Sequence, residues 1–177
     1  EKVLTPANIE AAFGVRAVIF QDPFSGTPTI SLLDQALSQA HSGNASRVHV
    51  VCGGGTGARL MYELQQAGLA VTAGPLGAGD ADRSAADILG VDYVSVPAFS
   101  AISEDAHARH LNLIGSSEFV VLCDLPVGIN NLPNLEAVQS AVRLICLEST
   151  PFQERDFTGG VAHRLYKSLS PTAICRT

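Results

Sequence analysis

The sequence predicts an α/β protein, a Rossmann-like, doubly wound and mostly parallel sheet of about six strands, with a short helix–strand appendage at its N-terminus. From residue 47 onward, short runs of Val, Ile and Leu alternate with helical stretches. Continuous apolar runs of this kind are typical of strands that are buried on both faces of a parallel sheet. The length of 177 residues suits one such domain with a small addition, and a 46% hydrophobic content can supply its core.

Residues 1–33 differ in sequence pattern from the rest of the chain and predict a small separate unit. Thr5 is a typical N-cap and Pro6 a typical first helical residue. The expected elements are a helix over 7–13 that ends at Gly14, and strands over 15–20 and 27–33 joined by a turn over 22–26. A polar linker follows, so we predict a tail with its linker over 1–40 and a Rossmann-like domain over 47–177.

The second region predicts six strands and five helices in alternation. Gly68 and Gly90 follow two of the helices and are expected as C-caps without chemistry. The expected strands are 48–52, 69–73, 92–96, 119–123, 143–147 and 172–175, and the expected helices are 57–67, 80–89, 103–114, 132–141 and 159–169. With a strand order of 3-2-1-4-5, the loops after the strands share one edge, where such sheets bind ligands.

Composition excludes several classes of function. A net charge of −6 without a cluster of Lys or Arg disfavours nucleic acid as a partner. No apolar run approaches the roughly 20 residues of a membrane span, and no signal peptide is visible. The absence of an initiator Met indicates a piece of a longer chain. The cysteines lie in apolar runs without close pairs and are expected as reduced core thiols, not zinc ligands; they are Cys52, Cys123, Cys146 and Cys175.

The glycine-rich turn after the first strand of this sheet is the clearest candidate for a ligand-binding motif. It matches G-x-G-x-x-A between a strand and a helix, a setting in which free N–H groups at the helix N-terminus favour an anion or phosphate. The alternative is a tight turn that needs glycine for geometry alone. The next strand ends at Ala73 without an acidic residue, which disfavours ordinary NAD binding. The candidate ligand-binding residues of this turn are Gly53, Gly54, Gly55, Thr56 and Gly57.

Three further loops at the same edge complete one expected crevice. The second loop offers carboxylates, which could instead cap the next helix; the loop over 124–134 offers amides, which are also common turn formers. The fifth loop carries two glycines at a helix start, which predicts close approach of a backbone or ligand and a second anion-attracting N-terminus. The candidate residues are Gly79, Asp80, Asp82, Asp124, Asn130, Asn131, Thr158, Gly159 and Gly160.

Catalytic templates are missing from the sequence. It has no G-x-S-x-G elbow, no H-E-x-x-H pair and no G-x-x-x-x-G-K-[ST] phosphate-binding loop. His107 and His110 have a spacing of three residues but no further ligand nearby, so we expect them on a solvated helix face. We therefore predict no catalytic residue and no metal site in this chain.

Several motifs carry a resemblance to a known family. Residues 4–9, 13–15 and 22–28 resemble the closing segment of ATP-binding subunits of ABC transporters for iron–siderophore complexes and cobalamin. Residues 48–169 resemble a C-terminal domain that is appended to some of those subunits. The motifs of that second resemblance lie at 53–57, 73–82, 97–100, 124–135 and 155–160.

This resemblance implies a regulatory or ligand-sensing domain of an importer subunit for metal chelates or cobalamin. The implied parent is cytoplasmic and peripheral to the inner face of the membrane, holds ATP and Mg in its own ATPase domain, and contacts membrane permease subunits. No cofactor is expected in the present chain itself, whereas a homodimer and a small anionic ligand are. Two alternatives stay open: a small Rossmann-type enzyme or binding protein for a nucleotide or phosphosugar, and a dimerisation module without a ligand.

Overall fold

The computed structural model describes residues 5–13, 16–21, 28–33 and 45–176, and it divides the chain into two compact units. The first unit comprises residues 1–40 and the second residues 41–177. The predicted turn over 22–26 and most of the predicted linker lie outside the described residues. That the first unit is the tail of an ABC ATPase stays a prediction.

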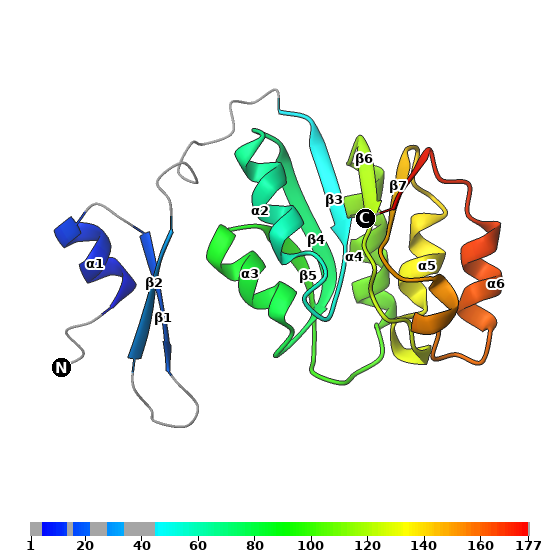
Figure 1. The fold of residues 1–177 in the computed structure, drawn as a ribbon, viewed down its shortest axis with the longest axis horizontal. Coiled ribbons are helices and arrows are strands. Elements are labelled where there is room, and N and C mark those ends of the chain that lie inside the picture. The colour runs from blue at the N-terminus through cyan, green and yellow to red at the C-terminus, as the bar shows by residue number, and fades with distance from the viewer. Residues whose placement is uncertain (1–4, 14–15, 22–27, 34–44, 177) are drawn as a thin grey trace. The chain divides into compact units, whose positions relative to one another are not determined.

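The first unit contains one helix and a two-stranded antiparallel sheet (Figure 1). The elements are α1 (Pro6–Phe13), β1 (Arg16–Gln21) and β2 (Pro28–Leu33). The hydroxyl of Thr5 accepts a hydrogen bond from the Asn8 amide at 3.1 Å, which confirms the predicted N-cap. Both predicted strands are present: β1 is displaced by one residue, and β2 begins one residue later than predicted.

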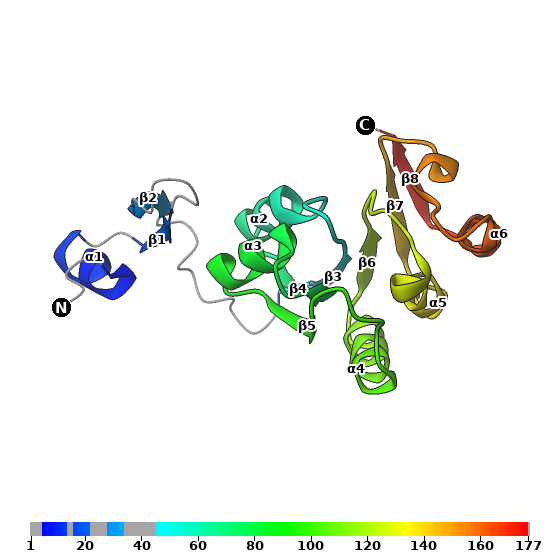
Figure 2. The same ribbon diagram turned by 90° about the horizontal axis from the view of Figure 1, so that it is seen from below.

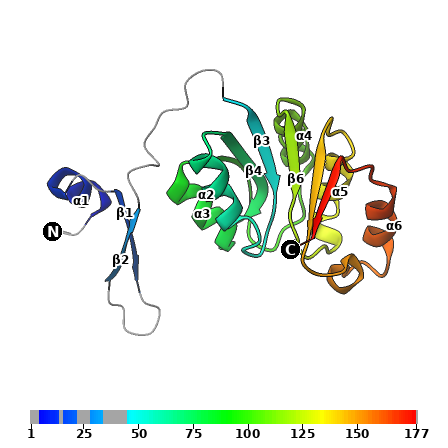
Figure 3. The same cartoon turned by 45° about the horizontal axis from the view of Figure 1, so that its top comes forward.

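The second unit is built on a six-stranded sheet in which every neighbouring pair is parallel, as predicted. Its strand order is β5-β4-β3-β6-β7-β8. The strands are β3 (Arg47–Val51), β4 (Ala70–Gly77), β5 (Asp92–Val96), β6 (Phe119–Leu122), β7 (Leu144–Glu148) and β8 (Ala173–Arg176). The chain reverses its direction of winding between β3 and β6, which lie side by side in the middle of the sheet (Figure 3). This order contains the order 3-2-1-4-5 that we assumed for the first five strands, with β8 added at the edge.

Helices cover both faces of this sheet. Figure 2 shows α2 and α3 on one face and α4, α5 and α6 on the other. The helices are α2 (Ala58–Gln66), α3 (Ala81–Leu89), α4 (Glu104–Gly115), α5 (Pro133–Val138) and α6 (Val161–Ser168). A buried cluster that includes Leu122, Leu135 and Phe152 fills the space between the sheet and α5 and α6. Gly68 and Gly90 follow α2 and α3 with positive φ angles, as expected of C-caps.

Two elements differ from the prediction. Strand β4 continues beyond Ala73 to Gly77, although it contains Pro75, which cannot donate a ladder hydrogen bond. The pairing with β5 shifts register between Ala73 and Leu76, so an irregularity accommodates the proline. Helix α5 ends at Val138, three residues before the expected end, because the amides of Gln139 and Ser140 bond to carbonyls three residues back and not four. A separate turn of 3₁₀ helix, η2 (Ile129–Asn131), precedes it.

Two predictions about exposure are wrong. His110 is completely buried, not on a solvated helix face, because α4 packs this side chain onto β3, where its ring centroid lies 5.0 Å from that of His49. Burial lowers the pKa of His110 to about 2 and that of His49 to about 4. Cys175 is exposed because β8 is an edge strand, whereas the other three cysteines are buried and unpaired as expected.

No helix in the described part of the chain combines the length and apolar character that crossing a membrane requires. The same residues contain no group of three or more His, Cys, Asp or Glu side chains that could hold a metal ion.

Candidate ligand-binding crevice

The glycine-rich turn between β3 and α2 already holds an anion, and that anion belongs to the protein. One carboxylate oxygen of Asp82 accepts hydrogen bonds from the amides of Gly57 at 2.9 Å and Ala58 at 2.8 Å. The other accepts from the Gly55 amide at 3.2 Å. Asp82 is completely buried and lies in the first turn of α3, so its charge is stabilised by the N-termini of two helices.

Two further amides of this turn are also engaged. The Gly54 amide donates to the Asp80 carboxylate at 3.0 Å, and the Gly53 amide contacts the Thr56 hydroxyl at 3.4 Å. Asp80 is at the same time the N-cap of α3, since it accepts from the Asp82 amide at 2.9 Å. The capping role that we considered as the alternative for these two acids is therefore present, and it includes the neighbouring turn.

The start of α6 repeats this pattern. Asp156 accepts hydrogen bonds from the amides of Thr158 at 2.7 Å and His163 at 3.1 Å, and the Thr158 hydroxyl accepts from Ala162 at 2.7 Å. The hydrogen bonds from Thr158 lower the pKa of Asp156.

The two glycines before α6 have a conformational reason. Both Gly159 and Gly160 have positive φ angles, and a side chain on Gly159 would meet open space. They allow a left-handed turn into the helix, which an L-residue rarely adopts. No backbone atom of the described residues approaches either position, so the predicted close approach of a backbone is not present, whereas that of a ligand stays a prediction.

These hydrogen bonds change what the predicted anion would require. Backbone N–H groups bind phosphate when they are free at a helix N-terminus. Here both N-termini are capped by carboxylates of the same chain, so an external anion would have to displace Asp82 or Asp156. Binding at these residues stays a prediction, but the structure gives it fewer free donors than the sequence suggests.

An open cavity of about 240 Å³ lies beside the capped turn, where the chain leaves β3, β4 and β5 and enters η2. We call it the switch-point crevice. Four of our candidate residues line it, namely Gly53, Asp80, Asn130 and Asn131. The rest of its lining consists of Cys52, Pro75, Gly77, Val96, Pro97, Phe99, Ser100, Ile102 and Asn134. The prediction that loops of distant sequence converge at this edge is thus met for three of the four loops.

Polar groups in the crevice include a side chain without a partner. Asn134 is 2% exposed, and its Oδ1 has no hydrogen-bond partner among the described residues. Asn131 is engaged in its own turn, where its Oδ1 accepts from the Gly128 amide at 2.7 Å and its Nδ2 donates to the Pro126 carbonyl at 2.9 Å. The residues that line the crevice in the described part of the chain include no Lys, Arg or His, so its only formal charge is that of Asp80.

An aromatic side chain stands at the rim. Phe99 is 101% exposed and has a φ of 56°, a left-handed conformation that is unusual for a bulky residue. Its carbonyl accepts a weak hydrogen bond from Asn130 at 3.4 Å, and the Ile102 amide donates to the Asn130 carbonyl at 3.0 Å. The loop after β5 is therefore tied to η2 across the crevice.

Asp124 was expected in the same crevice but lies in a separate ion pair. Its carboxylate is 2.7 Å from the guanidinium of Arg155, which is 5% exposed, and it also accepts from the hydroxyls of Ser149 and Thr150. Burial opposes ionisation, but the hydrogen bonds from Ser149 and Thr150 and the charge of Arg155 outweigh it and lower the pKa of Asp124. This network holds the end of β6 to the loop after β7.

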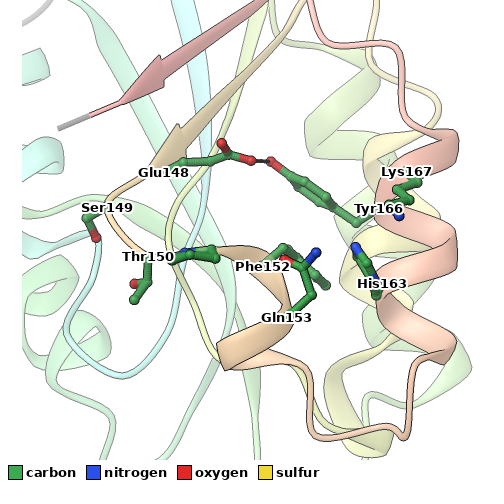
Figure 4. Close-up of a pocket in the computed structure, with 9 residues that line it drawn as sticks. Glu148, Ser149, Thr150, Phe152, Gln153, His163, Tyr166 and Lys167 are labelled. Carbon is green, nitrogen blue, oxygen red and sulfur yellow. Dashed lines mark hydrogen bonds between the residues drawn. The ribbon is translucent and has the colours of Figure 1, made fainter.

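That network borders a second, larger cavity of about 490 Å³ (Figure 4). Tyr166 points from α6 toward Glu148 at the end of β7 and donates a 2.5 Å hydrogen bond to it. The ring of Tyr166 stacks on Phe152 of η3 (Phe152–Arg155) with centroids 4.1 Å apart. The cavity is lined by Glu148, Ser149, Thr150, Pro151, Phe152, Gln153, His163, Tyr166 and Lys167.

Sequence reasoning missed the two groups that shape the crevice most. Asn134 belongs to the amide-rich loop, but its burial depends on how α5 packs. Phe99 lies in the motif over 97–100, which we quoted without assigning it to a site. Ten candidate residues lie outside the lining of the crevice, namely Gly54, Gly55, Thr56, Gly57, Gly79, Asp82, Asp124, Thr158, Gly159 and Gly160.

Comparison with known protein families identifies the family to which this domain belongs. The model of the MJ0874 family matches residues 71–177, which is more than half of the chain. This chain belongs to the MJ0874 family. The match includes β4 to β8 and three of the loops that line the switch-point crevice, but not the glycine-rich turn at 53–57.

A separate comparison with curated proteins finds two that are similar to the chain. Both are cobalamin import ATP-binding proteins, named BtuD, from two strains of Halobacterium salinarum, and each is 35% identical over 106 residues. The similarity covers 60% of this chain and 26% of each relative, so the chain spans about a quarter of the length of the curated relatives it matches. A relationship to ATP-binding subunits of ABC importers is thereby supported. No solved structure matches the chain.

Proposed function

We propose that this MJ0874-family domain is a ligand-sensing or regulatory domain that accompanies the ATP-binding subunit of an ABC importer for cobalamin or a metal chelate. The observation that supports this most is its 35% identity to part of a cobalamin import ATP-binding protein. The chain itself lacks the G-x-x-x-x-G-K-[ST] loop, so ATP and Mg would bind in an ATPase domain of the parent protein. That parent would be cytoplasmic and would contact membrane permease subunits.

The crevice supports a sensing role over a catalytic one. It lies at the switch point between β3 and β6, where open α/β sheets bind their ligands. Its lining includes a single carboxylate, Asp80, and that group is engaged as a helix cap. A general base with a free proton-accepting role is not visible among the described residues that line it.

The first experiment is a thermal-shift screen of the whole chain against cobalamin, cobinamide, ferric siderophores and nucleotides. A ligand present at 100 times its dissociation constant adds about 2.7 kcal/mol to the free energy of unfolding and raises the melting temperature measurably. We expect at least one importer-related compound to stabilise the chain, and no Mg-dependent ATP hydrolysis. Stoichiometric ATPase activity, or turnover of a nucleotide, would favour the enzyme alternative.

A matched pair of variants links any stabilisation to the crevice. Asn134→Leu places an apolar side chain of similar size at the buried crevice position, whereas Asn112→Leu makes the same change on the exposed side of α4. The ligand should lose its effect on the first variant and keep it on the second. No stabilisation by any compound, together with a tight homodimer in sedimentation, would favour the dimerisation module.

A further inference from the structure

We infer that the switch-point crevice takes a flat, uncharged or cationic group that donates hydrogen bonds, such as a carboxamide or amidinium on a ring, and that it does not take the anion predicted from the glycine-rich turn. The inference rests on the proposed function, since it assigns a ligand chemistry to the same crevice. It depends on the charges that line the crevice, on the partners of its polar groups and on its aromatic rim.

The charge at the crevice is negative. Asp80 is the only formally charged residue of its described lining, and the buried Asp82 lies directly behind the same turn. No Lys, Arg or His of the described residues lines the cavity to offset these carboxylates. An anion that enters would meet like charges in a partly desolvated site, whereas a cation or neutral donor would not.

The polar groups need donors more than they need acceptors. The Asp80 oxygens accept from the Gly54 and Asp82 amides, and one of them receives only the bond from Gly54. Because each carboxylate oxygen can accept two hydrogen bonds, Asp80 has room for a donor from a ligand. By contrast, the amides of Gly53, Gly54, Gly55 and Gly57 already donate to acceptors of the same chain, which leaves few donors for a phosphate.

Asn134 shows that a partner is missing. Its Oδ1 is buried without a hydrogen bond, and an unsatisfied buried polar atom costs roughly 1–3 kcal/mol. A half-turn of the amide exchanges oxygen and nitrogen, so Asn134 can present either to a ligand. A carboxamide is the natural complement, because it has two N–H donors, one for the Oδ1 of Asn134 and one for Asp80.

The walls suit a flat apolar group. Val96, Pro97 and Ile102 line one side of the crevice, and the exposed ring of Phe99 stands at its rim. A cavity of about 240 Å³ is large enough for a single ring with a small polar substituent. The ring of Phe99 can then stack on the ligand, and its attraction to a cation favours an amidinium further.

Three probes of equal shape test the inference: benzamidine, benzamide and benzoate, titrated into the ¹⁵N-labelled whole chain and followed by NMR. They share one ring and differ in charge and in donor count. We expect benzamidine and benzamide to shift the Asn134 side-chain amide and the Ser100 backbone amide, and to bind about tenfold or more tightly than benzoate, as electrostatic repulsion requires. Phe99→Ala should weaken benzamide about fivefold, as loss of a stacking partner predicts. Phe157→Ala, which removes another exposed ring, should not.

Each other result overturns the inference. If benzoate bound as tightly as benzamide, the crevice would be an anion site after all. The proposed sensing function would stand in that case, because the crevice would still bind a ligand. Shifts confined to residues outside the lining, or no shift with any probe, would show that the crevice lacks this chemistry. Failure of the proposed function is recorded separately, by the absence of stabilisation in the screen of importer-related compounds.

Discussion

Removal of the Asp82 carboxylate should uncover the anion site that the sequence predicts. Asp82→Ala leaves the amides of Gly55, Gly57 and Ala58 without the acceptor that they now share at 2.8–3.2 Å. Because the site is completely buried, the loss of these charge-assisted hydrogen bonds should lower the free energy of unfolding by about 3–5 kcal/mol. For a chain of this length that corresponds to a fall of about 10 °C in melting temperature.

The variant also allows chemical rescue. Formate has the size of the missing carboxylate and can accept the same hydrogen bonds at the N-terminus of α2. Formate should therefore raise the melting temperature of Asp82→Ala more than that of the wild type, and more than chloride does at equal ionic strength. Asp82→Asn, which keeps the volume and one acceptor, should cost less than the alanine variant.

Asp87→Ala is the matched control for this experiment. Asp87 lies on the same helix, is exposed, and accepts one hydrogen bond from Tyr93 at 2.7 Å. Its removal should cost less than about 1 kcal/mol and should show no formate effect. A cost below about 1 kcal/mol for Asp82→Ala, or equal stabilisation of all variants by formate, would refute the claim that the carboxylate fills an anion site.

The remaining predictions concern the core. The folded pKa values of His49 and His110 are lowered to about 4 and about 2, so the unfolded chain binds more protons below pH 6.5. The free energy of unfolding should then fall as pH drops from 6.5, with His49 alone costing up to about 3 kcal/mol by pH 4. His110→Leu should make this pH dependence shallower, as measured by urea denaturation at several pH values. The same pH dependence in this variant and in the wild type would contradict the burial of the ring. Gly57→Ala should destabilise the chain by about 1–3 kcal/mol, because the added Cβ would lie 2.5 Å from the side chain of Cys52. Gly77→Ala, with open space around its Cβ, should be close to neutral in the same melts.

The sequence by itself determined the fold class and the edge at which a crevice forms, whereas the strand order was only assumed. Buried apolar runs such as 119–122 are local signals, and the hand of β–α–β connections leaves few ways to arrange them. Capping glycines at Gly68 and Gly90 end their helices through local backbone conformation alone. Because all strands of the sheet are parallel, their carboxyl ends meet at one edge, and this is why Gly53 and Asp80 line one cavity.

Only the tertiary structure decided which polar groups are free. Whether the amides after β3 can bind a ligand depends on Asp82, which lies in the first turn of α3 and reaches them only when α2 and α3 pack side by side. The burial of His110 likewise depends on α4 lying against His49 of β3, and the missing partner of Asn134 depends on how the first turn of α5 packs. A motif reports the conformation that a turn can adopt, whereas its chemistry depends on side chains that distant segments bring to it, because a hydrogen-bond donor can be satisfied by whichever acceptor the fold places nearest.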